Sequence, residues 1–193
     1  MSEDALSKRG RSLEDDYFRK KDRELIEKIR QAAAAARVRK DLGSTIGLED
    51  PALLQELLDL GFTPETAVLL PLVPVIQMAW AEGGITEAER ELILRLARSR
   101  GVGVGSAADQ QLMEWMTTHP SDAVFSRTRR LIRAILDAGS AGGHTGDLTA
   151  DDLVKHCEEI ASASGGILGI GRISAEERAL LASIAADLNA RRS

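Results

Sequence analysis

The stretch that decides the fold is Ala79-Trp80-Ala81-Glu82-Gly83-Gly84, followed by Ile85-Thr86-Glu87-Ala88-Glu89-Arg90. It is repeated as Ala161-Ser162-Ala163-Ser164-Gly165-Gly166, followed by Ile173-Ser174-Ala175-Glu176-Glu177-Arg178. Each copy is typical of a helix that ends at a glycine pair, with a second helix that begins after a hydroxyl residue. An insert, residues 167–172, separates the two halves of the second copy. A duplicated helical hairpin predicts an all-α bundle built from two similar halves.

The composition favours helix packed on helix. The chain has 193 residues, of which 44% are hydrophobic and only 3% aromatic. The N-terminus has no apolar signal core, and the longest mainly apolar run, residues 67–81, is short for a membrane span. The single cysteine, Cys157, excludes an internal disulfide. We therefore expect a soluble, cytoplasmic protein with no membrane insertion.

Charge divides the chain into a basic and an acidic part. Residues 8–40 carry 12 Lys or Arg against 6 Asp or Glu, a balance of +6. Because the whole chain is −5 and residues 1–7 carry −2, residues 41–193 carry −9. Binding to duplex nucleic acid needs clustered Lys and Arg, so the acidic part argues against nucleic acid as the main partner.

The predicted organisation is a charged helical arm over residues 1–41, a linker over 42–50 and a helical domain over 51–193. Ser12-Leu13-Glu14-Asp15 can cap a helix that runs to about Arg39. Its apolar residues are sparse, which favours either a solvated, partly frayed helix or one that binds a partner or a second copy. The linker is predicted from Gly43-Ser44-Thr45-Ile46-Gly47.

Within the domain, the segment from Pro64 to about Glu82 is nearly all apolar and predicts the central helix. Pro71 and Pro74 should either kink this helix or delay its regular start. Four arginines, at positions 127, 129, 130 and 133, lie close together on another predicted helix. They are interpreted as a solvated face, or alternatively as a surface for an acidic partner.

The first hairpin, residues 78–90, resembles the tellurite-resistance TerB-like family, and the resemblance covers about residues 50–190. That family is an all-helical domain whose hallmark is a helix ending in Ala-Asp-Gly, a short turn and an acidic helix start. The resemblance implies an interaction module of stress-response assemblies, generally without a known catalytic activity. Its members are proposed to bind metal through the acidic positions.

Carried over by position, the resemblance implies a divalent cation such as Ca²⁺ at Glu82, Glu87 and Glu89, with Glu176 and Glu177 from the second copy. The second copy departs from the pattern, because Ser164 replaces the acid before the glycines. Acidic residues in a first helical turn are also what capping and the helix dipole favour without any metal. If the halves pack with pseudo-twofold symmetry, the two helix starts could converge on one site.

The arm carries a second resemblance. Residues 8–30 are similar to the inhibitory helix of the ATP synthase inhibitor family. The similarity is carried by residues 14–24, which include Tyr17, Phe18, Arg19, Arg23 and Glu24. This similarity implies that those five residues bind a partner.

No nucleophile–base pair or set of catalytic metal ligands is evident in the sequence. The leading prediction is therefore a non-enzymatic, cytoplasmic interaction module of the TerB-like type that can bind a divalent cation. The alternative is an inhibiting or anchoring protein that acts on a protein partner through its N-terminal helix.

Overall fold

The computed structural model describes the backbone of residues 3–137, 149–163 and 173–189, and within these ranges the side chains from Tyr17 onward. All regular secondary structure in these ranges is helical, which confirms the predicted all-α class. The helices are α1 (Glu3–Ile46), α2 (Pro51–Asp59), the 3-10 helix η1 (Ala67–Leu72), α3 (Val73–Ala79), α4 (Glu87–Ser99), α5 (Ala107–Thr117), α6 (Asp122–Asp137), α7 (Ala150–Ala163) and α8 (Ala175–Asn189).

The chain forms two compact units, residues 1–40 and residues 41–193. The first, which we call the arm, consists of α1 up to Lys40. Almost every described side chain of the arm is exposed. Its helix is supported by the strong helix formers of the Ala32–Ala36 run and by contacts within the helix, such as the Gln31–Glu27 hydrogen bond of 3.1 Å.

The second unit, which we call the body, begins where the sequence predicted a linker. Residues 42–50 are instead the last turn of α1 and a tight turn, and the side chains of Leu42, Ile46 and Leu48 are buried. Gly43 approaches the backbone so closely that a Cβ would lie 2.6 Å from the Leu48 carbonyl oxygen. The glycines that suggested a flexible linker therefore serve close packing and helix termination.

Three helices end within the body in the same way. These are α1, α2 and α4, each of which is followed by a glycine in the left-handed region and then by a buried apolar residue. After α1, Gly47 has φ 69° and the Leu48 amide donates to the Gly43 carbonyl at 3.0 Å. After α2, the Phe62 amide donates in the same way to the Leu57 carbonyl. After α4, the Val102 amide donates to the Ala97 carbonyl. This is the Schellman motif, which satisfies terminal carbonyls and returns an apolar side chain to the core.

The central segment of the body is η1 and α3. The prediction of a delayed helix start is confirmed, because residues 67–72 form a 3-10 turn and regular α-helix begins only at Val73. Pro74 lies in the first turn of α3, where its missing N–H removes no helical hydrogen bond. Of residues 67–79, all are buried except Val68 and Gln77, which are half-buried.

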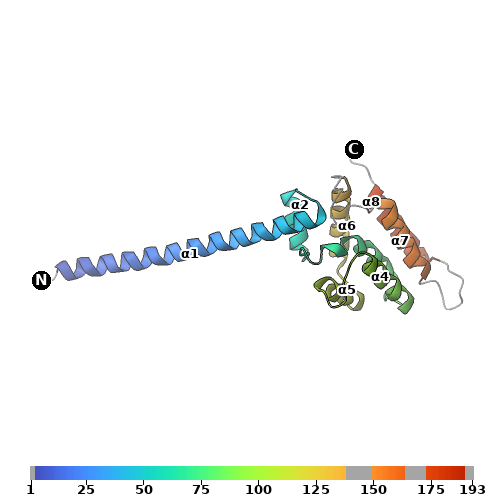
Figure 1. Cartoon of the computed structure of the whole chain (residues 1–193), viewed down its shortest axis with the longest axis horizontal. Coiled ribbons are helices and arrows are strands. Elements are labelled where there is room, and N and C mark those ends of the chain that lie inside the picture. The colour runs from blue at the N-terminus through green and yellow to red at the C-terminus, as the bar shows by residue number, and fades with distance from the viewer. Residues whose placement is uncertain (1–2, 138–148, 164–172, 190–193) are drawn as a thin grey trace. The chain divides into compact units, whose positions relative to one another are not determined.

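The other helices of the body surround α3. It packs against α4, α6, α7 and α8, and α8 also packs against α6 and α7. Figure 1 shows α7 and α8 side by side at the C-terminal end of the body. Both hairpins of the repeat thus contribute to one core around α3, while α2 and α5 complete the surface beside η1.

Candidate functional site

The exposed face of the arm is the first candidate site. Phe18, Leu25 and Ile29 are 60%, 57% and 59% exposed. At 100° per residue, their spacings of seven and four bring them to one face of α1, together with Ala32 and Ala36. We call these five residues the apolar stripe. It continues over about five turns of helix without a partner in the described residues.

Basic side chains lie on both sides of the apolar stripe. The helical positions of Lys21, Lys28 and Arg39 lie along one edge. On the other side Asp22 lies next to the stripe, and beyond it lie Arg19, Arg30 and Arg37, about 100–120° round the helix from Phe18. The acidic residues of the arm are fewer and are partly engaged within the helix, as in the 3.9 Å contact between Lys21 Nζ and Glu24. The stripe therefore presents an apolar centre between positive edges.

The five arm residues predicted from the sequence do not all lie on this stripe. Tyr17 and Phe18 contact each other edge to face, with ring centroids 5.8 Å apart, but Tyr17 lies 100° further round the helix. Arg23 donates to the Arg19 carbonyl at 3.2 Å, and Glu24 faces Lys21. The predicted set does not include Leu25 and Ile29, which share the exposed face of Phe18 and can be found from their helical spacing.

The predicted cation site contains two capping boxes. At the start of α4, Thr86 N–H and Oγ1 both donate to Glu89 Oε2 at 2.7 Å, and the Glu89 amide donates back to Thr86 Oγ1 at 3.3 Å. At the start of α8, the Ser174 amide donates to Glu177 Oε2 at 2.7 Å, and the Glu177 amide donates to Ser174 Oγ at 3.1 Å. The two helix starts therefore have the same geometry.

Both capping glutamates are buried. Glu89 is 2% exposed and Glu177 is 1% exposed. Burial raises the pKa of Glu89 above its usual range, against the opposing effect of the hydrogen bonds from Thr86. The negative charges of Glu177 and Glu82 raise the pKa of Glu89 further. The charge of Glu177, at the start of α8, thus acts on Glu89 at the start of α4.

The remaining predicted ligands are exposed. Glu82, Glu87 and Glu176 lie on the surface, and Glu87 is 3.9 Å from Arg90. Among the described residues, no group of three or more His, Cys, Asp or Glu side chains has an arrangement that could hold a metal ion. Ser164, which replaces the family's acid, lies outside the described residues. A cation site at these positions remains a prediction.

A third acidic helix start shows the same local use of a carboxylate. Thr149 Oγ1 and N–H donate to Asp152 at 2.7 and 3.1 Å, and the Asp152 amide donates to Thr149 Oγ1 at 3.1 Å. The hydrogen bonds that the Asp152 carboxylate accepts from the Thr149 hydroxyl and amide lower the pKa of Asp152. Glu89, Asp152 and Glu177 thus serve capping at the starts of α4, α7 and α8.

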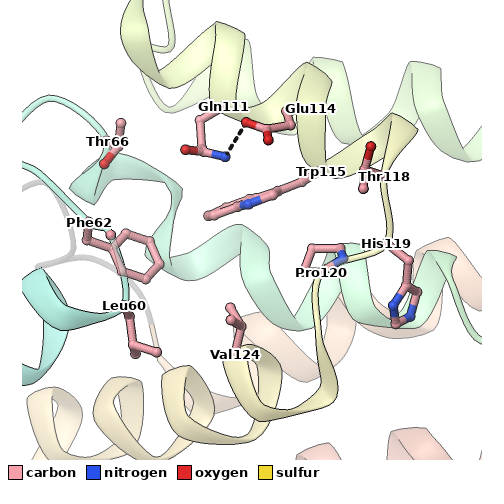
Figure 2. Close-up of a pocket in the computed structure, with 11 residues that line it drawn as sticks. Leu60, Phe62, Thr66, Gln111, Glu114, Trp115, Thr118, His119, Pro120 and Val124 are labelled. Carbon is pink, nitrogen blue, oxygen red and sulfur yellow. Dashed lines mark hydrogen bonds between the residues drawn. The ribbon is translucent and has the colours of Figure 1, made fainter.

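A pocket of about 210 Å³ in the body is the second candidate site (Figure 2). Its walls come from the turn after α2, from the end of α5 and from the start of α6. In Figure 2, Trp115 occupies the centre, with Gln111 and Glu114 on one side and Leu60 and Val124 on the other. Glu114 accepts a hydrogen bond of 3.1 Å from Gln111. The pocket thus has an apolar interior and a polar rim.

Aromatic contacts hold the pocket wall in place. Phe62 packs edge to face on Trp115, with centroids 5.8 Å apart. The Trp115 carbonyl accepts a 2.9 Å hydrogen bond from the indole N–H of Trp80, whose ring packs edge to face on His119 at 5.1 Å. From the sequence, Trp115 is expected in the core. It is instead half-buried and packs against the buried core.

The arginine cluster of α6 is structural at three of its four positions. Arg129 is 8% exposed, donates to Asp187 of α8 at 2.9 and 2.8 Å, and donates to Gln77 of α3. Arg127 contacts Glu56 of α2 at 3.3 Å. Arg133 donates to the Asp187 carbonyl of α8 at 3.4 Å and contacts Asp137 of its own helix at 3.3 Å. The interpretation as a solvated or partner-binding face is wrong for these residues, since their charges join α6 to its neighbours.

The glycine-rich turn between α4 and α5 is a braced connection. Arg98 donates to Asp109 at 2.6 Å and to the Val102 carbonyl at 2.8 Å. The other carboxylate oxygen of Asp109 accepts from the Gly105 amide at 2.8 Å. The Gly105 amide, followed by Arg98, lowers the pKa of Asp109. These hydrogen bonds fix the conformation of the turn between α4 and α5.

Comparison with known proteins gives no further assignment. No protein-family model matches the chain, and no curated protein or solved structure matches it significantly. The resemblances to the TerB-like and ATP synthase inhibitor families therefore remain predictions. Within the residues that the structure describes, no helix is both long enough and apolar enough to cross a membrane.

Proposed function

We propose that this chain is a non-enzymatic interaction protein that binds a protein partner through the apolar stripe of its N-terminal helix. The observation that carries the proposal is the exposure of Phe18, Leu25 and Ile29 at helical spacing on one face. Burying a large apolar side chain stabilises a complex by about 1.5–3 kcal/mol. Three such residues on one face can anchor the helix in a groove of the partner or against a partner helix.

The charge around the stripe indicates the chemistry of the partner. Basic edges favour a partner surface that is apolar at its centre and acidic at its margins, because complementary charges speed association and exclude wrong partners. The helix is formed by local interactions, so less ordering entropy opposes binding than for a segment that folds on contact. An inhibitor or anchor of a larger assembly, such as the ATP synthase inhibitor-like role, is one form of this function.

The cation-dependent, TerB-like role in a stress-response assembly remains a separate prediction with weaker support. The observation that supports it is electrostatic: the charges of Glu177 and Glu82 raise the pKa of Glu89. Against it, Glu89 and Glu177 already direct a carboxylate oxygen to their caps. A hard cation such as Ca²⁺ needs six to eight oxygen ligands, so binding there would compete with the capping hydrogen bonds.

The test is affinity capture from native lysate with the full chain, a chain that begins at Asp41, and a Phe18→Ser/Ile29→Ser double variant. Val38→Ser is the matched control, because Val38 is exposed on the arm but lies away from the stripe. Partners should be retained by the full chain and the control, and lost from the other two. If the double variant retains the same partners as the full chain, the stripe is not the binding surface.

The same captures, run in calcium and in chelator, separate the two roles. Binding through the arm should be the same in both conditions. Partners that the chain beginning at Asp41 retains in calcium and loses in chelator would favour the cation-dependent role of the body.

A further inference from the structure

The pocket beside Trp115 has the chemistry of a receptor for an apolar side chain with basic neighbours. Its interior surface includes Leu60, Phe62, Trp115 and Val124, and none of its lining residues is Lys or Arg. A volume of about 210 Å³ is several times the roughly 30 Å³ share of one water molecule in the liquid. One large apolar side chain can therefore enter it.

Acidic residues lie in and next to the segments that line the pocket. Glu114 is part of its lining, and three further acidic residues lie within two positions of a lining residue and are exposed. They are Asp59, Glu65 and Asp122. The Thr63 hydroxyl lowers the pKa of Glu65, so this carboxylate is charged over a wide pH range. The rim therefore favours positive charge beside whatever fills the pocket.

The chain itself contains a segment with this complementary chemistry. Phe18 is exposed on the arm and is followed directly by Arg19, Lys20 and Lys21. The six aromatic residues of the chain divide between the two regions. Tyr17 and Phe18 are on the arm, whereas Phe62, Trp80, Trp115 and Phe125 form one cluster with His119 around the pocket.

Charge argues against the simplest alternative, in which two arms pair along their stripes. Each arm carries +6 between residues 8 and 40, so a pair of arms would bring like charges together along the basic edges. The body carries −9. Contact between the arm of one molecule and the body of another joins opposite charges instead.

We propose that the partner of the apolar stripe is a second copy of this chain, with Phe18 of one molecule inserted beside Trp115 of the other. The proposal rests on the proposed function, since it names the partner of the same stripe. Arg19 and Lys21, at the edges of the stripe, then face the carboxylates of the rim. Such contacts are heterologous, so they form either a reciprocal dimer or an open chain of molecules.

Sedimentation equilibrium of the full chain tests this assembly. We expect reversible self-association that Phe18→Ser and Glu114→Arg each weaken about tenfold or more, because the first removes the side chain that fills the pocket and the second places a positive charge at its rim. Val38→Ser in the arm and Glu91→Arg in α4 are matched controls, exposed and outside both surfaces, and they should associate like the parent. Circular dichroism checks that each variant remains helical.

Mixing the two defective variants gives a sharper result. The Phe18→Ser chain keeps an intact pocket, and the Glu114→Arg chain keeps an intact arm. An equimolar mixture should regain association through one arm and one pocket. Raising the salt concentration should weaken it, since opposite charges are screened.

Tryptophan fluorescence locates the contact. The arm contains no tryptophan, and Trp115 is one of only two in the chain. Titrating a synthetic peptide of residues 8–40 into the full-length Phe18→Ser variant should give a saturable change in emission. The same peptide with Phe18 replaced by serine should give none.

Three results would overturn the inference. They are a monomer at all accessible concentrations, self-association that Glu114→Arg leaves unchanged and that salt strengthens, or binding of the full chain to vesicles of anionic phospholipid without self-association. The second result would indicate paired arms. Each of these leaves the capture experiment with the stripe variants as an independent test of the proposed function.

Discussion

The arm and the central segment of the body are both helical, yet different forces form them. In the arm, the large apolar residues Phe18, Leu25 and Ile29 are more than half exposed. In η1 and α3, residues such as Leu69, Val75 and Ile76 are fully buried. The arm depends on intrinsic helix propensity and contacts within one helix, whereas the central segment, interrupted by two prolines, depends on burial.

This comparison shows what an exposed apolar residue means in each region. In the body, an apolar stripe identifies the face that enters the core, and the neighbouring helices cover it. In the arm, the same spacing leaves a face without a partner among the described residues. The first kind of stripe explains stability, and the second indicates binding.

The largest difference should appear when one isoleucine is truncated in each region. Ile76→Ala should lower the free energy of unfolding by about 2–5 kcal/mol, because it leaves a cavity in the centre of the body. Ile29→Ala, at a side chain that is 59% exposed, should change it by no more than about 0.5 kcal/mol. Urea denaturation followed by tryptophan fluorescence measures both. Equal losses would mean that the arm contributes to the core.

Charge in the body should matter where it is buried. Arg129→Ala should destabilise the body by about 1–3 kcal/mol, because Asp187 and Gln77 lose their hydrogen-bond donor. Arg130, its exposed neighbour, is the control, and Arg130→Ala should stay within about 0.5 kcal/mol of the parent. Thermal unfolding of the two variants compares them directly. A stable Arg129→Ala chain would contradict the structural role of the cluster.

The capping box at α4 gives a smaller effect with a defined pH dependence. Glu89→Ala should cost about 1 kcal/mol, because the Thr86 amide loses its acceptor. Glu89→Gln should cost less, since its amide oxygen can still accept that hydrogen bond.

The sign of the pH dependence follows from the raised pKa of Glu89. The folded state binds the Glu89 proton more tightly than the unfolded state does. This residue therefore adds stability as the pH falls from neutral through its folded pKa, and the gain is complete below the usual range of Glu. Gln does not titrate, so the stability difference between parent and Glu89→Gln should shift in favour of the parent as the pH falls. A difference that is constant with pH would show that burial does not perturb this carboxyl.

The smallest effect on the body is expected from a change in the arm alone. Ala34→Gly replaces a strong helix former and should weaken the local helix by about 1 kcal/mol. The circular dichroism signal at low temperature should fall, while the thermal midpoint of the body stays unchanged. A shift of the body's midpoint would show that the two regions unfold together.

Much of the local structure could be predicted because it depends on neighbours in the sequence. Thr86 and Glu89 form their capping box within one turn, and regular helix begins at Val73, as Pro71 and Pro74 allowed. The predicted linker failed for the opposite reason. Its glycines are the same in a flexible segment and in a packed turn, and only the burial of Leu42 and Ile46 distinguishes the two.

The candidate sites could be predicted only in part. Tyr17 and Phe18 were predicted to bind a partner from the resemblance of the charged helix, whereas Leu25 and Ile29 became candidates only because the described structure leaves them exposed. The pocket had no signal in the sequence. Its walls come from segments around residues 60, 115 and 124, which are far apart along the chain.

The sequence by itself determined the helical class, the delayed start of α3 and the caps at Thr86 and Ser174, because these depend on interactions between residues a few positions apart. Tertiary structure alone decided that Arg129 would be buried against Asp187, that Glu89 would approach Glu177 and that Trp115 would line a pocket. Each of these depends on which distant helices meet. A local pattern can specify that a face is apolar or charged, but only packing determines what that face touches.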